Sequence, residues 1–187
     1  MAQNANNVVY SKPKANGAMW SAAEGAALPT DAVAAIDDAF ENWGYISEDG
    51  VEEAHSLSSE TVKDYGKSPV LVIYGGDELT IALTALEYTN PVVQKNLFGD
   101  ANVTATDGKL GKVVLTDEAK AVKSYIIEHV LSNGQIERDV IPRGIVTAID
   151  TVTFSASGAL GYKVTITPLA DSSNAKEYKY FAEATTA

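Results

Sequence analysis

The chain contains no cysteine and only two histidines, His55 and His129. Without thiols it can form no disulfide, no thiolate nucleophile and no thiolate metal site. The histidines do not lie in an HExxH arrangement, and their spacing indicates no third ligand. We therefore expect both histidines at a surface or an interface, and the sequence predicts no metal site and no cofactor.

Long hydrophobic runs are also missing. The longest apolar stretches are far too short to span a bilayer. The first residues lack the basic start and apolar centre of a secretory signal peptide. The expectation is a protein that is made and folded in a cytoplasm and does not enter a membrane.

Motifs for catalysis are scarce as well. The Gly75-Gly76 pair is not followed by the GK[ST] of a phosphate-binding loop, and no serine sits in a strand-turn-helix elbow. The acidic pairs Asp37-Asp38 and Glu52-Glu53 are adjacent, so their side chains diverge on a helix or a strand. The sequence predicts no enzyme, and a hydrolase whose carboxylates meet only in the fold is the remaining catalytic alternative.

Basic residues are few and unevenly placed. The chain has 14 Lys and Arg against 25 Asp and Glu, a net charge of -11, and the first 66 residues hold eleven of the acids but three of the bases. Tight nucleic-acid binding needs clustered Lys and Arg, so a phosphate-binding footprint is not expected. An acidic surface also keeps a protein soluble.

What the chain does contain is the material of one globular domain. Its 187 residues are 45% hydrophobic and 21% charged, enough for a single buried core. A central unit runs from Gly66 to Asp100. It reads as a strand at Val70–Tyr74 covered on both faces, a Gly75-Gly76 hairpin turn, an alternating strand and a helix at 91–98 capped by Asn90. The core residues predicted from this unit are Leu79, Ile81, Leu83, Val93 and Leu97.

The segments before the central unit are less regular. Residues 1–16 are predicted to be a mobile polar arm. A helical segment is expected where Val33, Ile36 and Phe40 share helical spacing. A strand at 43–46 should end in a Glu48-Asp49-Gly50 turn. Residues 48–68 show alternation only in pieces, which indicates weak strands or a long loop.

The C-terminal half alternates as strands do. Strands are predicted at 125–131, 136–141, 145–149, 151–155, 162–168 and 178–181. Asn133-Gly134 is a strong hairpin signal, and taking it as a two-residue turn places Glu128 opposite Asp139 and Val130 opposite Glu137. This register puts Glu128, Glu137 and Asp139 on one side of the hairpin, which must be wet or carry a cation. The fold class is therefore mainly β, a β-sandwich or curled antiparallel sheet with one short helix.

Three stretches together resemble the major tail tube proteins of long-tailed, non-contractile bacteriophages. They are LPTDAVAAIDDAFENWGYISEDGVE, DELTIALTALEYTNPVVQKNLFGD and GIVTAIDTVTFSASGALGYKVTITPLAD, which cover most of residues 28 to 171 in the family's order and spacing. The resemblance implies a β-rich virion subunit that forms hexameric rings, stacked into a tube through which DNA leaves the capsid. Its partners would be copies of itself, other tail proteins at the tube ends, and DNA that passes without sequence-specific binding.

The resemblance also suggests roles for the two acidic regions. Residues 48–68 become a candidate contact with a neighbouring subunit or ring, through Glu48, Asp49, Glu52, Glu53, Glu60, Lys63, Asp64 and Tyr65. Glu128, Glu137 and Asp139 become candidates for a lumen wall that repels DNA phosphate, with an ordinary solvated exterior as the alternative. A β-sandwich binding module, such as a virion decoration or receptor-contacting domain, is the alternative function.

Overall fold

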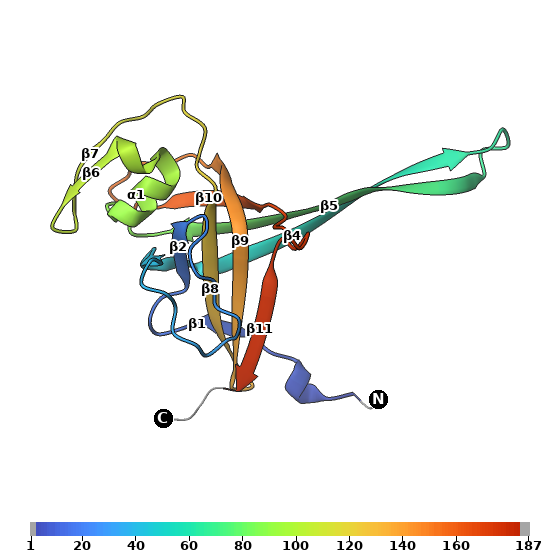
Figure 1. The fold of residues 1–187 in the computed structure, drawn as a ribbon, viewed down its shortest axis with the longest axis horizontal. Coiled ribbons are helices and arrows are strands. Elements are labelled where there is room, and N and C mark those ends of the chain that lie inside the picture. Colours follow the sequence, from blue (N-terminus) through green and yellow to red (C-terminus); the bar gives the residue numbers. More distant parts are fainter. Residues whose placement is uncertain (1–2, 184–187) are drawn as a thin grey trace.

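The computed structural model describes residues 3–183, which form a mainly β molecule with one short α-helix. Nine strands make one antiparallel sheet in the order β3-β2-β8-β9-β10-β5-β4, with β1 added on β8 and β11 on β9, and β6 and β7 form a separate hairpin. Figure 1 shows that one two-stranded arm, β4 and β5, extends far beyond the rest of the molecule. The expected mainly β fold is confirmed.

The strands have the following bounds: β1 Ser11–Pro13, β2 Met19–Ala23, β3 Glu41–Asn42, β4 Ile46–Lys63, β5 Pro69–Ala85, β6 Val103–Thr106, β7 Lys109–Val113, β8 Lys123–Leu131, β9 Gln135–Ile149, β10 Tyr162–Pro168 and β11 Tyr178–Glu183. The helix α1 spans Pro91–Phe98, and two short 3-10 turns occupy Ala5–Asn7 and Asp100–Asn102. The N-terminal segment expected to be a mobile arm pairs with β8 through β1.

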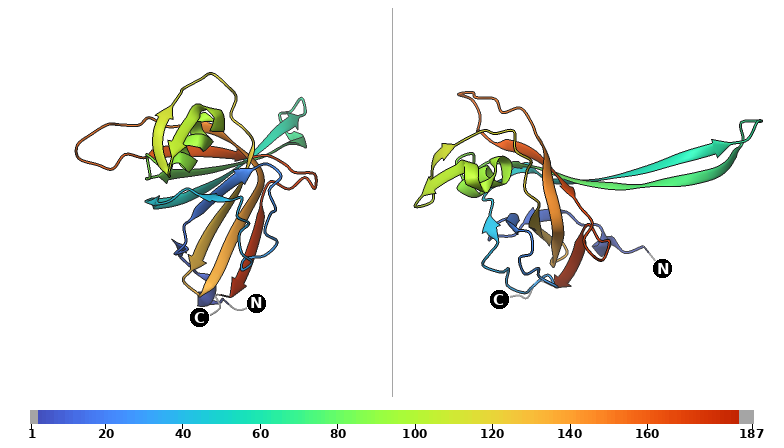
Figure 2. Two further views of the ribbon diagram at one scale, coloured as in Figure 1. Left: turned by 60° about the vertical axis from the view of Figure 1, so that its left-hand side comes forward. Right: turned by 45° about the horizontal axis from the view of Figure 1, so that its top comes forward.

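Strand β9 joins the two halves of the molecule. Its first part pairs with β8 and β11, and its last part pairs with β10. Because the strand passes from one set of neighbours to the other, the sheet curls, and the two sets of strands run in clearly different directions (Figure 2). The curled antiparallel sheet, one of the two arrangements expected from sequence, describes the fold.

The larger core lies between these two halves and under α1. Strands β5 and β10 supply one wall, β2, β8 and β9 the other, and the helix buries Val93 and Leu97 against them. Asn90 caps α1 by accepting a hydrogen bond from the Val92 N–H, with Pro91 at the first helical position. The predicted core residues are all buried within the chain: Leu79, Ile81, Leu83, Val93 and Leu97.

Several local predictions are wrong. No helix forms around residues 31–40, where the Asp31 carboxylate accepts the Val33 and Ala34 N–H groups and Arg138 Nη1 donates to the Asp31 and Ala34 carbonyls. The strand expected at 43–46 does not form, because residues 43–45 connect β3 to β4 and only Ile46 is strand, and residues 48–50 lie inside β4 as an irregularity, not a turn. Residues 151–155 are not a strand, since β9 ends at Ile149 and no strand lies beside them.

Candidate self-association surface

The most distinctive surface is the projecting hairpin formed by β4 and β5. Much of the segment expected as a loop at 48–68 is strand, and only residues 64–68 form the connection. Asp64 makes that tip: its carboxylate accepts the Ser68 N–H at 2.8 Å, and its own N–H donates to the Ser68 carbonyl at 2.9 Å. The hydrophobic pattern did not predict this hairpin. A strand that packs on no second layer needs no regular alternation of apolar and polar residues.

The Gly75-Gly76 pair is not the hairpin turn that the sequence predicted. It lies within β5 where the pairing with β4 slips, between Ser58 and Ser59. Gly76 has φ of 116°, and a Cβ on Gly75 would lie 2.5 Å from Ser58 Oγ. The two glycines therefore accommodate a β-bulge, which bends the arm without ending it.

The outer part of β5 was expected to be covered on both faces and is instead exposed on both. Alternation places Val70, Val72 and Tyr74 on one face of the arm and Leu71 and Ile73 on the other. Each of these five side chains is between 47% and 66% exposed. A continuous apolar run open to water on both faces is typical of a surface that another chain covers.

The residues assigned to this segment are spread along the arm, from Glu52 opposite Ala82 near the body to Glu60 opposite Ile73 of the apolar run. Tyr65 stands at the tip, fully exposed, and Glu48, Asp49, Glu52, Glu60 and Lys63 are exposed along β4. Glu53 differs from them because it contacts the body of the molecule through Lys179 of β11. Burial opposes ionisation of Glu53, but hydrogen bonds from Lys179 and His55 outweigh it and lower the pKa of Glu53.

The three acids expected to share one face of the β8–β9 hairpin do not share it. The loop has three residues, with Gly134 at φ of 89° and its N–H bonded to the Leu131 carbonyl, so the pairing moves by one position. Glu128 then lies opposite Arg138, while Asp139 and Glu137 lie opposite Ile127 and His129 on the other face. The prediction that all three acids lie on one face is therefore wrong.

Glu128 is bound and buried. Its Oε1 accepts hydrogen bonds from Arg138 Nη2 at 2.6 Å and Nε at 3.0 Å, and from Lys14 Nζ at 2.9 Å. Both Glu128 and Arg138 are 1% exposed. On the opposite face, burial and the nearby Asp139 carboxylate raise the pKa of Glu137, which is half-buried. Position 128 thus carries a structural ion pair.

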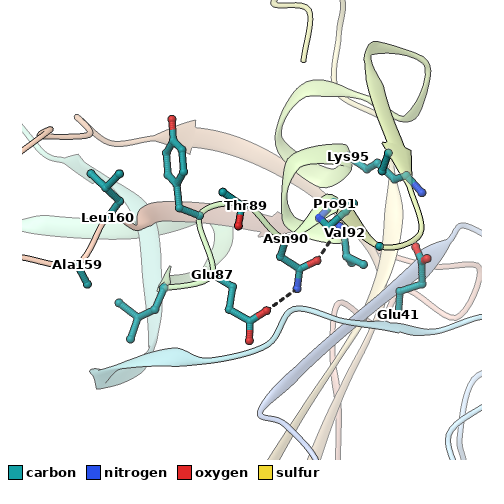
Figure 3. A pocket seen from close by; sticks show the side chains of 13 residues that line it. Glu41, Glu87, Thr89, Asn90, Pro91, Val92, Lys95, Ala159 and Leu160 are labelled. Atoms are coloured by element: carbon teal, nitrogen blue, oxygen red, sulfur yellow. Dashed lines mark hydrogen bonds between the residues drawn. The ribbon is translucent and has the colours of Figure 1, made fainter. Parts of the chain in front are cut away.

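A shallow groove of about 910 Å³ at the start of α1 offers the other candidate site. Figure 3 shows Glu87, Asn90 and Lys95 around it. Glu87 is used structurally, because its carboxylate accepts from the Asn90 amide at 3.0 Å and from the Tyr45 N–H at 3.1 Å. Its carboxylate therefore holds the chain around the helix start in place.

The described part of the chain has neither a cluster of metal-ligating side chains nor a membrane-crossing helix. Within residues 3–183, no three His, Asp or Glu side chains are grouped so that they could hold a metal ion. The same residues contain no helix with the length and apolar character needed to cross a membrane.

Comparison with known proteins identifies the family. No curated protein matches the chain closely enough to count as a relative. The family described as "Phage tail tube protein" matches residues 1–187, the whole chain. A projecting, two-sided apolar arm on a curled β body suits a subunit that is built into a larger structure, and the expected resemblance is confirmed. The chain belongs to the phage tail tube protein family.

Proposed function

We propose that this protein assembles into hexameric rings that stack as the tail tube, and that the β4–β5 arm packs on a neighbouring copy. The observation that carries the proposal is the apolar run at 70–74, exposed on both faces of the arm. The chain belongs to the phage tail tube protein family, and a tube built from repeated subunits would bring the arm of one copy against another. Covering this run would remove apolar surface from water, which favours association.

The arm is also suited to contact a partner by its backbone. β4 is the last strand of the sheet, so one edge of its 18 residues is unpaired within the described chain. Long unpaired edges invite a further strand or a covering segment. An arm that meets its partner with two apolar faces and one open edge can be ordered by assembly.

The test compares two double variants of the same arm. Val72→Asn with Ile73→Asn makes both faces of the run polar, whereas Ser59→Asn with Thr61→Asn changes exposed polar positions on the paired strand. Negative-stain microscopy and light scattering at rising concentration should show rings or tubes for the wild type and the control, and monomers for the apolar-run variant. All three should melt at similar temperatures, because the altered side chains contact no core residue.

Two outcomes would contradict the proposal. Tubes formed equally well by the Val72→Asn, Ile73→Asn variant would show that the run is not an assembly surface. A wild-type chain that stays monomeric at every concentration would favour the alternative, a binding module such as a virion decoration domain. The symmetry of ring views decides whether the rings are hexameric.

The proposal includes the passage of DNA through the tube during ejection, in a virion assembled in the host cytoplasm with other tail proteins at the tube ends. A lumen position for Glu128, Glu137 and Asp139 stays a prediction. Because Glu128 is engaged by Arg138 and Asp139 is 4% exposed, Glu137 is the member best able to face the lumen. Glu137→Lys should keep assembly and slow ejection most at low salt, since added phosphate contacts are salt-sensitive. Unchanged ejection kinetics would exclude this role.

A further inference from the structure

An ionic cluster lies where the β4–β5 arm leaves the body, and Lys179 of β11 is at its centre. Lys179 Nζ donates to Glu53 Oε2 of β4 at 2.5 Å. It also lies 3.5 Å from Asp139 Oδ1 of β9 and 3.6 Å from Glu177 Oε1, just before β11. One ammonium group therefore ties the arm to two strands of the body.

The second strand of the arm is held from the same side. His55 bridges the two arm strands, with Nε2 2.8 Å from Glu53 Oε1 and Nδ1 3.3 Å from Asp77 Oδ2. Lys176 Nζ donates to the backbone carbonyl of Asp77. Figure 1 shows the segment that leads into β11 beside the base of the arm. Both arm strands are thus held by the segment at 176–179.

Backbone pairing alone does not set the direction of the arm. β10 pairs with β5 only over Ile81–Ala85, so β5 has no strand of the body beside it from Pro69 to Thr80. A two-stranded ribbon with no covering layer bends easily. The side-chain contacts at Glu53 and Asp77 lie next to Leu79, the outermost core residue of the arm, and are therefore placed to orient the part of the arm that projects beyond it.

The cluster holds more negative than positive groups, and its inner part, at Asp139 and Glu177, is poorly solvated. Asp77 Oδ1, Asp139 Oδ1 and Glu177 Oε1 are buried and have no hydrogen-bond partner within residues 3–183. The side chains of Asp139 and Glu177 are only 6% and 7% exposed. Burial without a hydrogen bond on Oε1 disfavours the charged form of Glu177. Protonation of Glu177 therefore removes one negative charge from the buried part of the cluster.

We propose that this cluster is a proton-dependent lock on the arm, which holds the arm in one direction when Glu177 and His55 are protonated and releases it when they lose their protons. When the Glu177 carboxyl is neutral, it does not compete with Glu53 for the ion pair with Lys179. The imidazolium of His55 attracts the carboxylates of both Glu53 and Asp77. The lock is formed within a single chain, and this inference does not depend on the proposed assembly into rings.

The direction of the pH effect follows from the groups themselves. Burial raises the pKa of Glu177 to about 7, against the attraction of Lys179, with Asp139 and Glu53 adding to the rise. Hydrogen bonds to Glu53 and Asp77 raise the pKa of His55. As pH rises through neutrality, ionised Glu177 competes with Glu53 for Lys179 and repels Asp139, while His55 loses its charge. The arm is then freed at alkaline pH.

The remaining titratable neighbours act on the same groups. Glu137 lies on the same face of β9 as Asp139, and its own pKa is raised by burial and by Asp139. His129 of β8 lies 3.5 Å from Asp139 Oδ2. Burial opposes the charge of Lys179, but its hydrogen bond to Glu53 and the carboxylates around it raise its pKa, so it stays protonated throughout. Lys179 therefore keeps its charge across this pH range, whereas the charge of Glu177 changes.

Spin labels can measure the lock directly, because the chain has no cysteine to compete with introduced ones. Labels at Tyr65→Cys on the arm tip and at Ala148→Cys on exposed β9 report the direction of the arm relative to the body. Spin-diluting the labelled chain with unlabelled protein leaves only distances within one chain, whatever its assembly state. We expect a narrow distance distribution at about pH 6 and a broad one at about pH 8, with a midpoint near 7.

Three variants make the assignment specific. Lys179→Gln should give a broad distribution at both pH values, and Glu177→Gln should stay narrow to a higher pH than the wild type. Glu60→Gln, exposed on the arm away from the cluster, is the matched control and should behave as the wild type. An identical wild-type distribution at both pH values would overturn the proposal, as would a narrow one in a folded Lys179→Gln chain. Because the distances are intramolecular, a failure of tube assembly would leave this result readable.

Discussion

Arg138 connects parts of the chain that are far apart in sequence. Its guanidinium donates to Glu128 on β8 and to the carbonyls of Asp31 and Ala34, while Lys14 reaches the same Glu128 carboxylate. A buried charge is tolerated only when such partners satisfy it. The pair thereby holds the N-terminal segment and the loop at 31–40 on the sheet.

Removing the cation tests this role. Arg138→Ala leaves the buried Glu128 carboxylate with Lys14 alone, and we expect the free energy of unfolding to fall by about 3–5 kcal/mol. Arg143→Ala is the control, since the Arg143–Glu24 pair is largely exposed and its ion pair should be worth at most about 1 kcal/mol. Urea denaturation measures both. Equal losses in the two variants would show that the Arg138 pair is not a buried anchor.

Leu97 tests the core beneath α1. Leu97 is fully buried in the larger cluster, so Leu97→Ala should cost about 2–5 kcal/mol through lost contacts and a cavity. Val33→Ala, at a site 56% exposed, should change stability by less than about 0.5 kcal/mol. A Leu97→Ala chain that keeps its melting temperature and loses only assembly would place Leu97 at an interface instead.

The β4–β5 arm is the element whose behaviour depends most on its surroundings. Its inner part shares the core through Leu79, Ile81 and Leu83, but its outer part has cross-strand hydrogen bonds and no second layer. A hairpin alone in water is marginally stable. The inner half of the β4–β5 pair is therefore rigid, whereas the cross-strand hydrogen bonds of its outer half open readily.

Hydrogen exchange should show this division. In the unassembled subunit, amides at 59–74 should exchange much faster than those at 79–85, because local opening of the outer arm exposes no core. Assembly into tubes should slow exchange at 59–74 while leaving 79–85 nearly unchanged. Strong protection of the outer arm in the free subunit would mean that the arm is ordered without a partner.

The whole molecule responds to pH through groups with opposite shifts. The pKa of Asp31 is lowered by backbone hydrogen bonds from Ala34 and Val33, and that of Asp171 by a backbone hydrogen bond from Ala175 and a bond from the Tyr178 hydroxyl. Their contribution to stability is present above about pH 4 and is lost as pH falls through their folded-state pKa values. Glu177 acts in the other direction, because its pKa is raised from 4.5 to about 7 in the folded chain.

Stability should therefore be greatest at mildly acidic pH. In the unfolded chain Glu177 loses its proton from about pH 4.5 upward, whereas in the folded chain it keeps the proton to about pH 7. The free energy of unfolding therefore falls as pH rises from 4.5 to about 7. The stabilisation from protonated His55 is lost over the range above 6.5. Melting temperatures measured from about pH 4 to 8 should decline toward alkaline pH, and Glu177→Gln should flatten the decline. A rise toward pH 8 would contradict the assignment of Glu177.

Local patterns were sufficient wherever neighbours along the chain determine the structure. The helix at 91–98 was predicted because Asn90, Pro91 and Gly99 act on the adjacent backbone. The strict alternation from Leu79 to Ala85 marked the buried face of β5 for the same reason. The strands on either side of Asn133-Gly134 were predicted by their own composition.

Pairing and exposure were decided only by the tertiary structure. A three-residue loop in place of a two-residue turn moved Glu128 from an acidic face to a buried pair with Arg138, because a shift of one position changes which side chains meet across the strands. The run at 70–74 reads like a buried strand but lies in an arm with no covering layer. Sequence alone determined the family, the mainly β class and the helix. The relative positions of the strands depend on contacts between residues that are distant along the chain. These contacts determine that the arm projects, that Glu128 pairs with Arg138, and that Lys179 meets Glu53.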